Sequence, residues 1–385
     1  MNPNNHIEQL IHDLCLSGVP YKTLGEVCAI LDSMRKPVSK ELRSKGRYPY
    51  YGANGILDYV NDYIFDGTYL LVGEDGSVIK KDKSPVLQWA TGKFWVNNHA
   101  HVLVEIKREA KLRYLYYILS TADVSGIVRG TPPKINQQNL KQIQIPLPPL
   151  PIQEEIVRIL DTFTELITNI DTEIKEQQKL FTKLLNSFYD TNTQRVPIAA
   201  LGNIIRGRRF TRTDIVEQGI PCIHYGDIYT KYSICVSKAL TYLIGDITKR
   251  MRYAQSGDVV YVGAGENDED IGMAIAWLGK EPVAVHDACY ILSKHEQNAK
   301  YLAYVSRANN FHHQLRMSVA MGKICSIPPD GLGRVKIPLP SLAEQNRIVK
   351  QLETIEALIT NLKTERDLRQ QQYEYYREKL INLLK

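Results

Sequence analysis

An internal repeat constrains the fold of this chain more than any other feature of its sequence. Residues 145–170 and 337–362 align without a gap at an offset of 192 positions, and 14 of the 26 aligned residues are identical. The matches include paired prolines, one glutamine and a shared Leu-Ile-Thr-Asn run. A match of this length indicates a duplicated module, so we expect two related halves.

Each copy of the repeat predicts an extended segment followed by a long helix. The prolines of the IPLP sequence prevent a helix from passing through them, and apolar residues then recur at spacings of three and four. A seam of this length needs a partner helix, and the simplest partner is the other copy, paired antiparallel. The predicted helix-pairing residues are Ile156, Phe163, Leu166 and Ile170 in the first copy and Leu352, Ile355, Ile359 and Leu362 in the second.

The segments before the two helices predict similar globular domains. Both contain short β-rich runs broken by Gly, Asn and Asp, which favours an α/β (α+β) fold. The predicted order is an N-terminal helix in 1–19, a domain at 20–148, a helical region at 149–190, a second domain at 191–340 and a helical region at 341–385. Because a short helix precedes each domain, the order is close to cyclic. We therefore expect the chain ends to be close together and the halves to have pseudo-twofold symmetry.

Composition indicates a folded protein in a reducing compartment. The chain has 385 residues, 44% of them hydrophobic and 23% charged. It has no apolar run of 18 residues, so we expect no membrane span, and the polar N-terminus shows no secretory signal. Six scattered cysteines form no CxxC pair, which is typical of reduced thiols and predicts a cytoplasmic location.

The positive charge lies in two separate blocks. The net charge is +6, and residues 20–150 hold 18 basic against 12 acidic residues while residues 191–340 hold 18 against 13. Two basic blocks of similar size indicate two surfaces for a polyanion.

Motifs for catalysis are missing from the sequence. The fragments nearest to a phosphate-binding loop, at 91–94 and 321–324, lack the Ser or Thr that would hold Mg²⁺. A GxG sequence at 263–265 is followed by a cluster of carboxylates, so we interpret it as a tight turn. The sequence offers no set of residues from which a metal site or a catalytic site can be assembled. A less favoured alternative is that the chain is an enzyme whose active site combines the 263–266 loop with Asp287.

Both domains instead combine basic, aromatic and amide residues in their loops. Arg and Lys can contact phosphates and read guanine, while Asn can read adenine. The candidate DNA-binding residues are Arg43, Lys45, Arg47, Tyr50, Asn54, Lys80, Lys81, Arg129 and Lys134 in the first domain and Arg206, Arg208, Arg209, Lys249, Arg250, Arg252 and Lys323 in the second.

The sequence resembles the specificity subunits of Type I restriction–modification systems over essentially its whole length. The resemblance rests on the repeated IPLPPLPIQEEIV and IPLPSLAEQNRIV segments, and on the YYGANG, DYIFDG, GEDG and NNHAH sequences of the first domain. It implies two target-recognition domains that each read half of a split double-stranded DNA sequence, with the paired helices fixing the gap. Because the second domain's loops differ from the first, we expect an asymmetric target.

The resemblance also implies partners that carry out the chemistry. Such a chain docks two methyltransferase subunits, which use S-adenosylmethionine, and joins restriction subunits, which use ATP and Mg²⁺. The chain itself is then a non-catalytic DNA-binding subunit without a cofactor of its own. The alternative is a coiled-coil scaffold that organises partner proteins without binding DNA.

Overall fold

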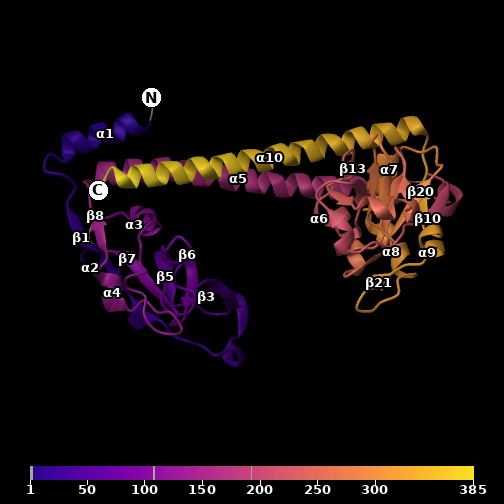
Figure 1. The fold of residues 1–385 in the computed structure, drawn as a ribbon. Coiled ribbons are helices and arrows are strands. Elements are labelled where there is room, and N and C mark those ends of the chain that lie inside the picture. Colours follow the sequence, from indigo (N-terminus) through magenta and orange to yellow (C-terminus); the bar gives the residue numbers. More distant parts are fainter. Residues whose placement is uncertain (1–2, 107–108, 192) are drawn as a thin grey trace. The chain divides into compact units, whose positions relative to one another are not determined.

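The structure, a computed structural model, describes residues 3–106, 109–191 and 193–385. The chain divides into two compact units, of which unit 1 is 1–170 with 365–385 and unit 2 is 171–364. Each unit combines one globular domain with parts of the two long helices (Figure 1). Within the described ranges, no helix is long and apolar enough to cross a membrane.

Unit 1 is built on a six-stranded sheet with the strand order β2-β7-β5-β6-β3-β4. Its strands are β2 (Cys28–Ile30), β3 (Lys45–Gly52), β4 (Gly55–Val60), β5 (Phe65–Gly73), β6 (Leu87–Val96) and β7 (Ala100–Glu105). A two-stranded sheet joins β1 (Tyr21–Thr23) to β8 (Gln144–Pro146). The short helices are α1 (Pro3–Leu14), α2 (Leu24–Val27), α3 (Leu112–Leu119) and α4 (Gln137–Lys141), with 3-10 turns at Asp32–Met34 and Lys40–Leu42.

Both faces of the central strand β5 are covered. Leu70 and Val72 join the core that contains α3 and the start of the first long helix, whereas Leu71 joins a separate aromatic core with Phe65 and Phe94. Alternate residues of a strand point to opposite faces, so the continuous apolar run in β5 supplies both cores.

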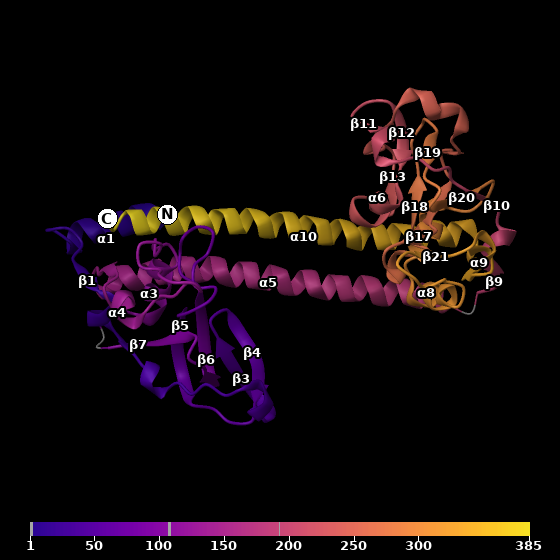
Figure 2. The ribbon, with the colours of Figure 1, turned by 60° about the horizontal axis from the view of Figure 1, so that its bottom comes forward.

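Unit 2 contains two five-stranded sheets, with the orders β10-β20-β16-β18-β13 and β11-β14-β12-β19-β15. The first comprises β10 (Asn203–Arg206), β13 (Cys235–Val236), β16 (Val259–Val262), β18 (Ala274–Trp277) and β20 (Cys289–Ser293). The second comprises β11 (Ile215–Val216), β12 (Ile220–Ile223), β14 (Thr241–Leu243), β15 (Tyr253–Ala254) and β19 (Val283–Val285), visible in Figure 2.

Smaller elements complete unit 2. Two further strand pairs are β9 (Arg195–Pro197) with β22 (Lys336–Pro338) and β17 (Ala264–Gly265) with β21 (Cys325–Ser326). The short helices are α6 (Tyr225–Thr230), α7 (Ala299–Val305), α8 (Asn309–Arg316) and α9 (Pro329–Gly333). Turns of 3-10 helix lie at Ile198–Ala200, Arg212–Asp214, Gly245–Arg250 and Asp268–Asp270.

The predicted long helices are α5 (Leu150–Tyr189) and α10 (Leu342–Asn382), each passing from one unit into the other. In unit 1 the start of α5 meets the end of α10, where Phe163 stacks on Tyr376 with ring centroids 5.4 Å apart. In unit 2 the end of α5 meets the start of α10, where the Arg347 guanidinium lies over the Phe188 ring at 6.0 Å from the centroid. The predicted antiparallel pairing is therefore confirmed within each unit.

The two copies of the repeat are fastened to their domains by the same hydrogen bonds. Gln153 and Gln345 are both fully buried. The Gln153 amide donates to the carbonyl oxygen of Pro148 at 2.8 Å, and that of Gln345 donates to Pro340 at 2.9 Å. Each side-chain oxygen accepts from a backbone N–H just before a short helix, that of Lys111 before α3 and of Asn298 before α7.

Seven of the eight predicted helix-pairing residues are buried or half-buried, and Leu166 is the exception. Ile156, Ile170, Leu352 and Leu362 are buried, and Phe163, Ile355 and Ile359 are half-buried, but Leu166 is 40% exposed. Its neighbour Ile167 is half-buried. A straight helix has 3.6 residues per turn, so its buried face drifts by about 20° per heptad from a seam that repeats every 3.5 residues. In a helix of this length, strict heptad counting therefore assigns Leu166 to the buried face, although it is exposed.

The chain ends lie in the same unit, as the cyclic order predicted. Ile7 of α1 and Leu380, Ile381 and Leu384 at the end of the chain belong to one buried core. The pseudo-twofold relation between the halves stays a prediction.

Candidate nucleic-acid interface

The two units present corresponding loops at the same end of corresponding strands. In chain order, β2, β5, β6 and β7 of unit 1 match β10, β16, β18 and β20 of unit 2, with the same neighbours in each sheet. The loop after β5 pairs with a later loop through an Asp75–Lys134 bridge, and β17, directly after β16, pairs with β21. We call these regions the unit 1 loop cluster (31–35, 74–76, 97–101 and 129–137) and the unit 2 loop cluster (206–211, 224–225, 264–266, 286–288 and 320–326).

An ion network holds the unit 1 loop cluster together. The Arg35 guanidinium donates to a Glu74 carboxylate oxygen at 2.5 Å and to the Ala100 carbonyl oxygen at 2.8 Å. Lys134 Nζ lies 3.0 Å from the other Glu74 oxygen. His101 is fully buried, with Nδ1 2.6 Å from Asp32 Oδ2 and Nε2 2.8 Å from the Ile135 carbonyl oxygen.

The network keeps both of its carboxylates ionised. Burial raises the pKa of Asp32, but the hydrogen bond and charge of His101, with the charge of Arg35, outweigh burial and lower it. Burial likewise raises the pKa of Glu74, and the hydrogen bonds from Arg35 and Lys134 bring it below its ordinary value. Asp32, Glu74 and His101 offer metal-ligand atoms within 4.8 Å of one another. Because Arg35 and Lys134 already neutralise the carboxylates of Asp32 and Glu74, we interpret the arrangement as an ion network and not as a metal site.

Three of the predicted residues lie at the unit 1 loop cluster. Arg129 and Lys134 are exposed on its 129–137 segment. Asn54 is exposed at the tip of the β3–β4 hairpin, and Gln88 fastens this tip by donating to the Gly52 and Ala53 carbonyl oxygens at 2.9 and 2.8 Å. The tip also receives a bond from Asn97, whose backbone N–H donates to Tyr51. Hairpin tip and loop cluster therefore form one surface.

The remaining predicted residues of unit 1 lie elsewhere. Lys45 and Arg47 are at the opposite end of β3, about 20 to 25 Å from the tip at ~3.3 Å per residue. Lys80 and Lys81 are exposed in a turn that borders a cavity with Arg377 and Lys385 of the C-terminal segment.

Tyr50 is a correction to the predicted set. Its side chain is only 1% exposed, and its hydroxyl bonds to the backbone of Val38. The Arg43 guanidinium covers the ring at 4.4 Å from the centroid and also lies 3.5 Å from Asp58. The phenol is apolar enough to be buried once its hydroxyl is bonded, so this pair supports the β3–β4 hairpin.

The unit 2 loop cluster surrounds a pocket of about 400 Å³. Arg206 and Arg209 line it, together with Gly265, Glu266 and Asp287. Arg206 Nε donates to the Asp287 carbonyl oxygen at 2.7 Å, and Arg252 donates to the Arg206 carbonyl oxygen at 2.6 Å. The structure thus brings together Glu266 and Asp287, the carboxylates of the alternative enzyme site, but Arg206 and Arg209 line the same pocket.

Of the other basic residues of unit 2, two lie in segments of the loop cluster and two lie in a separate turn. Arg208 is exposed directly after Gly207, where a Cβ atom would meet the His286 carbonyl oxygen at 2.1 Å. Only glycine allows the two backbones to approach this closely, which explains the glycine within the arginine run. Lys323 is exposed beside the pocket residue Ile324, and Lys249 and Arg250 are exposed in the 3-10 turn at Gly245–Arg250.

Sequence reasoning missed the aromatic lining of the pocket. Phe210, His224, Tyr225 and His286 line its wall. Phe210 and His286 belong to segments 76 positions apart, and their rings meet edge to face with centroids 4.7 Å apart. No local sequence pattern signals contacts of this kind.

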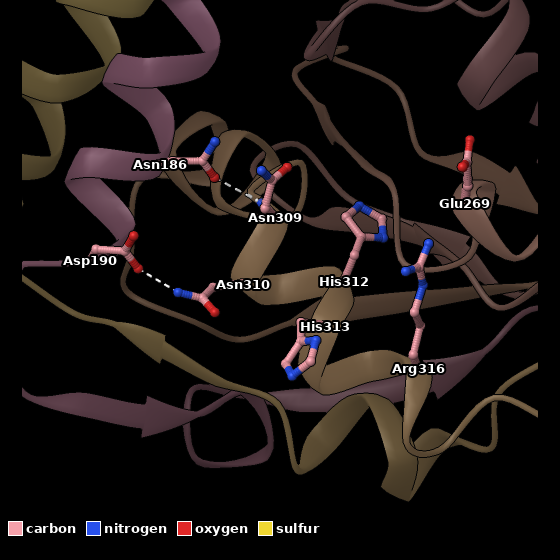
Figure 3. Close-up of a pocket in the computed structure, with 8 residues that line it drawn as sticks. All are labelled: Asn186, Asp190, Glu269, Asn309, Asn310, His312, His313 and Arg316. Atoms are coloured by element: carbon pink, nitrogen blue, oxygen red, sulfur yellow. Dashed lines mark hydrogen bonds between the residues drawn. The ribbon is translucent and has the colours of Figure 1, made fainter.

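A second cavity, of about 640 Å³, lies between the end of α5 and helix α8 (Figure 3). Asn186 of α5 accepts a hydrogen bond from the Asn309 backbone N–H at 2.9 Å, and Asn310 donates to Asp190. Arg316 lies 3.4 Å from Asp268. The two bonds to Asn186 and Asp190 fasten the end of α5 to α8 in unit 2, and no predicted DNA-binding residue lines the cavity.

Comparison with known proteins decides the family. The family model described as "Type I restriction modification DNA specificity domain" matches residues 17–179 and again residues 192–369. The chain belongs to the Type I restriction–modification specificity subunits. Two separate matches agree with two recognition domains and with a bipartite DNA target.

Two relatives of this family match over at least 90% of their length. A putative type I restriction enzyme specificity subunit from Haemophilus influenzae is 32% identical and covers 99% of both chains. The MjaVIII specificity subunit from Methanocaldococcus jannaschii is 23% identical over 94% of this chain and 90% of its own.

Solved structures support the same fold. The S subunit of M. genitalium matches with a TM-score of 0.55 at 14% identity, over 95% of this chain and 96% of that one. A chain from a study of complex assembly in the type I system matches with a TM-score of 0.57 at 15% identity, over 95% and 97%.

Proposed function

We propose that this specificity subunit reads an asymmetric split DNA target, with the domain at 20–148 reading one half-site and the domain at 191–340 reading the other. The observation that carries the proposal is the pair of loop clusters, which occupy the same end of matching strands but differ in chemistry. Unit 1 presents an ion network framed by Arg129 and Asn54, whereas unit 2 presents arginines around an aromatic pocket. Surfaces with different donors and acceptors select different bases.

The exposed basic residues supply attraction to the phosphate backbone. Each Lys or Arg that neutralises a phosphate releases counterions, so affinity falls steeply with salt whatever the sequence. Arg208 and Lys323 are exposed in the unit 2 loop cluster, Arg250 is exposed in the 3-10 turn at Gly245–Arg250, and all three suit this task. Asn54, Arg129 and Arg209 suit base reading, because amide and guanidinium groups pair with base edges in the major groove.

The long helices set the gap between half-sites and dock the partner subunits in this proposal. Two recognition surfaces on one scaffold reinforce each other only when the half-site spacing matches the scaffold, since the second contact is then intramolecular. The chain is a non-catalytic subunit that acts in the cytoplasm with two methyltransferase subunits and with restriction subunits. These partners use S-adenosylmethionine, ATP and Mg²⁺.

Methylation mapping tests the proposal. The chain is co-expressed with its modification subunit, and N6-methyladenine is mapped across the host DNA by single-molecule sequencing. We expect a split motif with methylated adenines in both halves that appears only when the chain is present. An active modification subunit without any chain-dependent motif would contradict the proposal and favour a scaffold role. DNA binding that does not change between about 50 and 200 mM salt would favour a scaffold as well.

A further inference from the structure

The aromatic pocket of unit 2 is built to contact the face of a planar ring. We define it by the rings of Phe210, His224, Tyr225 and His286 and by its rim residues Arg209 and Glu266. His224 lies 4.3 Å from Tyr225 and 4.8 Å from His286 between ring centroids, so the four rings form one continuous wall. The volume of about 400 Å³ is within the range of small-ligand sites, roughly 300–1,000 Å³.

The wall is uncharged, whereas the rim is charged. Burial lowers the pKa of His224, helped by the nearby His286, and burial also lowers the pKa of His286 against the opposing charge of Asp287. Both imidazoles are therefore neutral at pH 7. His286 uses both ring nitrogens in backbone bonds, since Nδ1 accepts from the Ala288 N–H at 3.1 Å and Nε2 lies 3.2 Å from the Phe210 carbonyl oxygen, and His224 Nδ1 accepts from the Gly226 N–H at 3.2 Å. The histidines thus offer mainly ring faces to a ligand. Arg209 and Glu266, both exposed at the rim, add a donor set and an acceptor. A heteroaromatic ring with polar edges matches this combination.

A base inside the double helix cannot use such a wall. Paired and stacked bases present only their edges in the grooves, so contact with a ring face requires the base to leave the stack. Proteins that hold unpaired bases stack them on aromatic and guanidinium groups, as this pocket offers. The matching loops of unit 1 are closed by the Arg35–Glu74 ion pair, which confines the inference to unit 2.

We propose that the aromatic pocket of unit 2 binds a single nucleobase displaced from the duplex within the half-site that unit 2 reads. This rests on the proposed function and adds to it a specificity contact on the face of a base. Displacing a base costs unpairing and unstacking energy, and that cost is smallest where the base pair is already mismatched. A mismatch at the displaced position should therefore tighten binding.

A mismatch scan with the full chain tests this inference. Once the target is mapped, each base pair of the second half-site is replaced in turn by a mismatch, leaving the methylated adenine paired. Affinities are measured by fluorescence anisotropy. We expect one position at which the wild type binds the mismatched duplex at least about tenfold more tightly than the matched one, because a tenfold gain needs only ~1.4 kcal/mol of the unpairing cost.

Two variants at one residue assign the effect to the pocket. Tyr225→Ala should reduce the mismatch preference to less than about twofold, while Tyr225→Phe, which keeps the ring, should retain it. Tyr59→Ala, at a tyrosine that is 51% exposed in unit 1, serves as the control and should also retain the preference. A far-UV circular dichroism spectrum and a Tm close to those of Tyr225→Phe show that Tyr225→Ala is folded.

Three outcomes would overturn the inference. They are equal affinities at every mismatch position, a mismatch preference that survives Tyr225→Ala, and binding of free deoxynucleoside monophosphates without any mismatch preference. Each of these leaves the mapped split motif intact. Failure of the proposed function would instead appear earlier, as the lack of any chain-dependent motif.

Discussion

Gln153 and Gln345 lie 192 positions apart, and each donates a hydrogen bond to the carbonyl oxygen of the proline five residues before it. Each also accepts a backbone N–H at the start of a short helix that packs on the long one. The glutamine is thus the fastening between the long helix and the domain before it. This explains why it is identical in the two copies of the repeat.

Replacing either glutamine should destabilise the unit that contains it. Gln153→Ala and Gln345→Ala each leave buried backbone groups unpaired, at a cost of about 1–3 kcal/mol for each such group. Urea unfolding followed by circular dichroism measures the loss. The control is Gln351→Ala at an exposed position on α10, which should change stability by less than about 0.5 kcal/mol. Equal effects of Gln351→Ala and Gln345→Ala would contradict this role.

The corrected helix seam can be tested with two truncations. Ile156→Ala empties a fully buried position and should cost about 2–5 kcal/mol. Leu166→Ala removes a side chain that is 40% exposed and should cost less than about 1 kcal/mol. Thermal unfolding of the two variants decides between the observed seam and strict heptad counting, which predicts similar losses.

Acid should weaken unit 1 through its ion network. The pKa values of Asp32 and Glu74 are held below their ordinary values, which are about 3.9 and 4.3 in an unfolded chain. Both carboxylates therefore stabilise the folded state fully above these unfolded values, and the contribution is lost as the pH falls through the lowered folded-state values.

The measurement compares stability at pH 7 and in steps below pH 4. We expect an Asp32→Asn/Glu74→Gln double variant to be less stable than the wild type at pH 7, with the difference shrinking as the pH falls. Glu374→Gln, at an exposed position of α10, should follow the wild type at every pH. A double variant that lost equal stability at all pH values would show that the carboxylate charges are not responsible.

Base-reading substitutions should act on one half-site at a time. Asn54→Ala in unit 1 and Arg209→Ala in unit 2 each remove a candidate base contact, which is worth about 1–3 kcal/mol when the contact is bidentate. Methylation mapping should therefore show relaxed sequence preference in one half of the motif and an unchanged other half. Lys280→Ala, at an exposed lysine after β18, is expected to leave both halves unchanged.

The length of the paired helices should set the length of the spacer. Seven residues inserted after Ile170 and seven before Glu365 keep the buried faces in phase and lengthen the pair by about 10 Å at ~1.5 Å per residue. The recognised gap should grow by about three base pairs at ~3.4 Å per step. Single-molecule methylation sequencing reads the new motif directly. An unaltered spacer would contradict the proposed role of the helices.

The sequence by itself determined the long-range plan of this protein. Its repeat, paired prolines and spacing of apolar residues predicted two domains, two long antiparallel helices and chain ends that lie close together. These features follow from local rules: proline blocks a helix, and apolar periodicity selects the buried face. A local rule also led to the error at Leu166, because a fixed heptad ignores the drift of a straight helix.

Only the tertiary structure decided which residues share a surface. Asn54 lies on a hairpin tip that is bonded to the loop cluster carrying Arg129, although 75 positions separate the two residues. Lys45 and Asn54 are only nine positions apart, but they lie at or beyond opposite ends of β3. Tyr50 is buried and supports a hairpin. Phe210 and His286 form a pocket wall that no sequence motif predicts. The physical reason is that strand pairing brings together loops from distant parts of the chain. Side chains on such loops carry no periodic pattern from which their neighbours can be predicted.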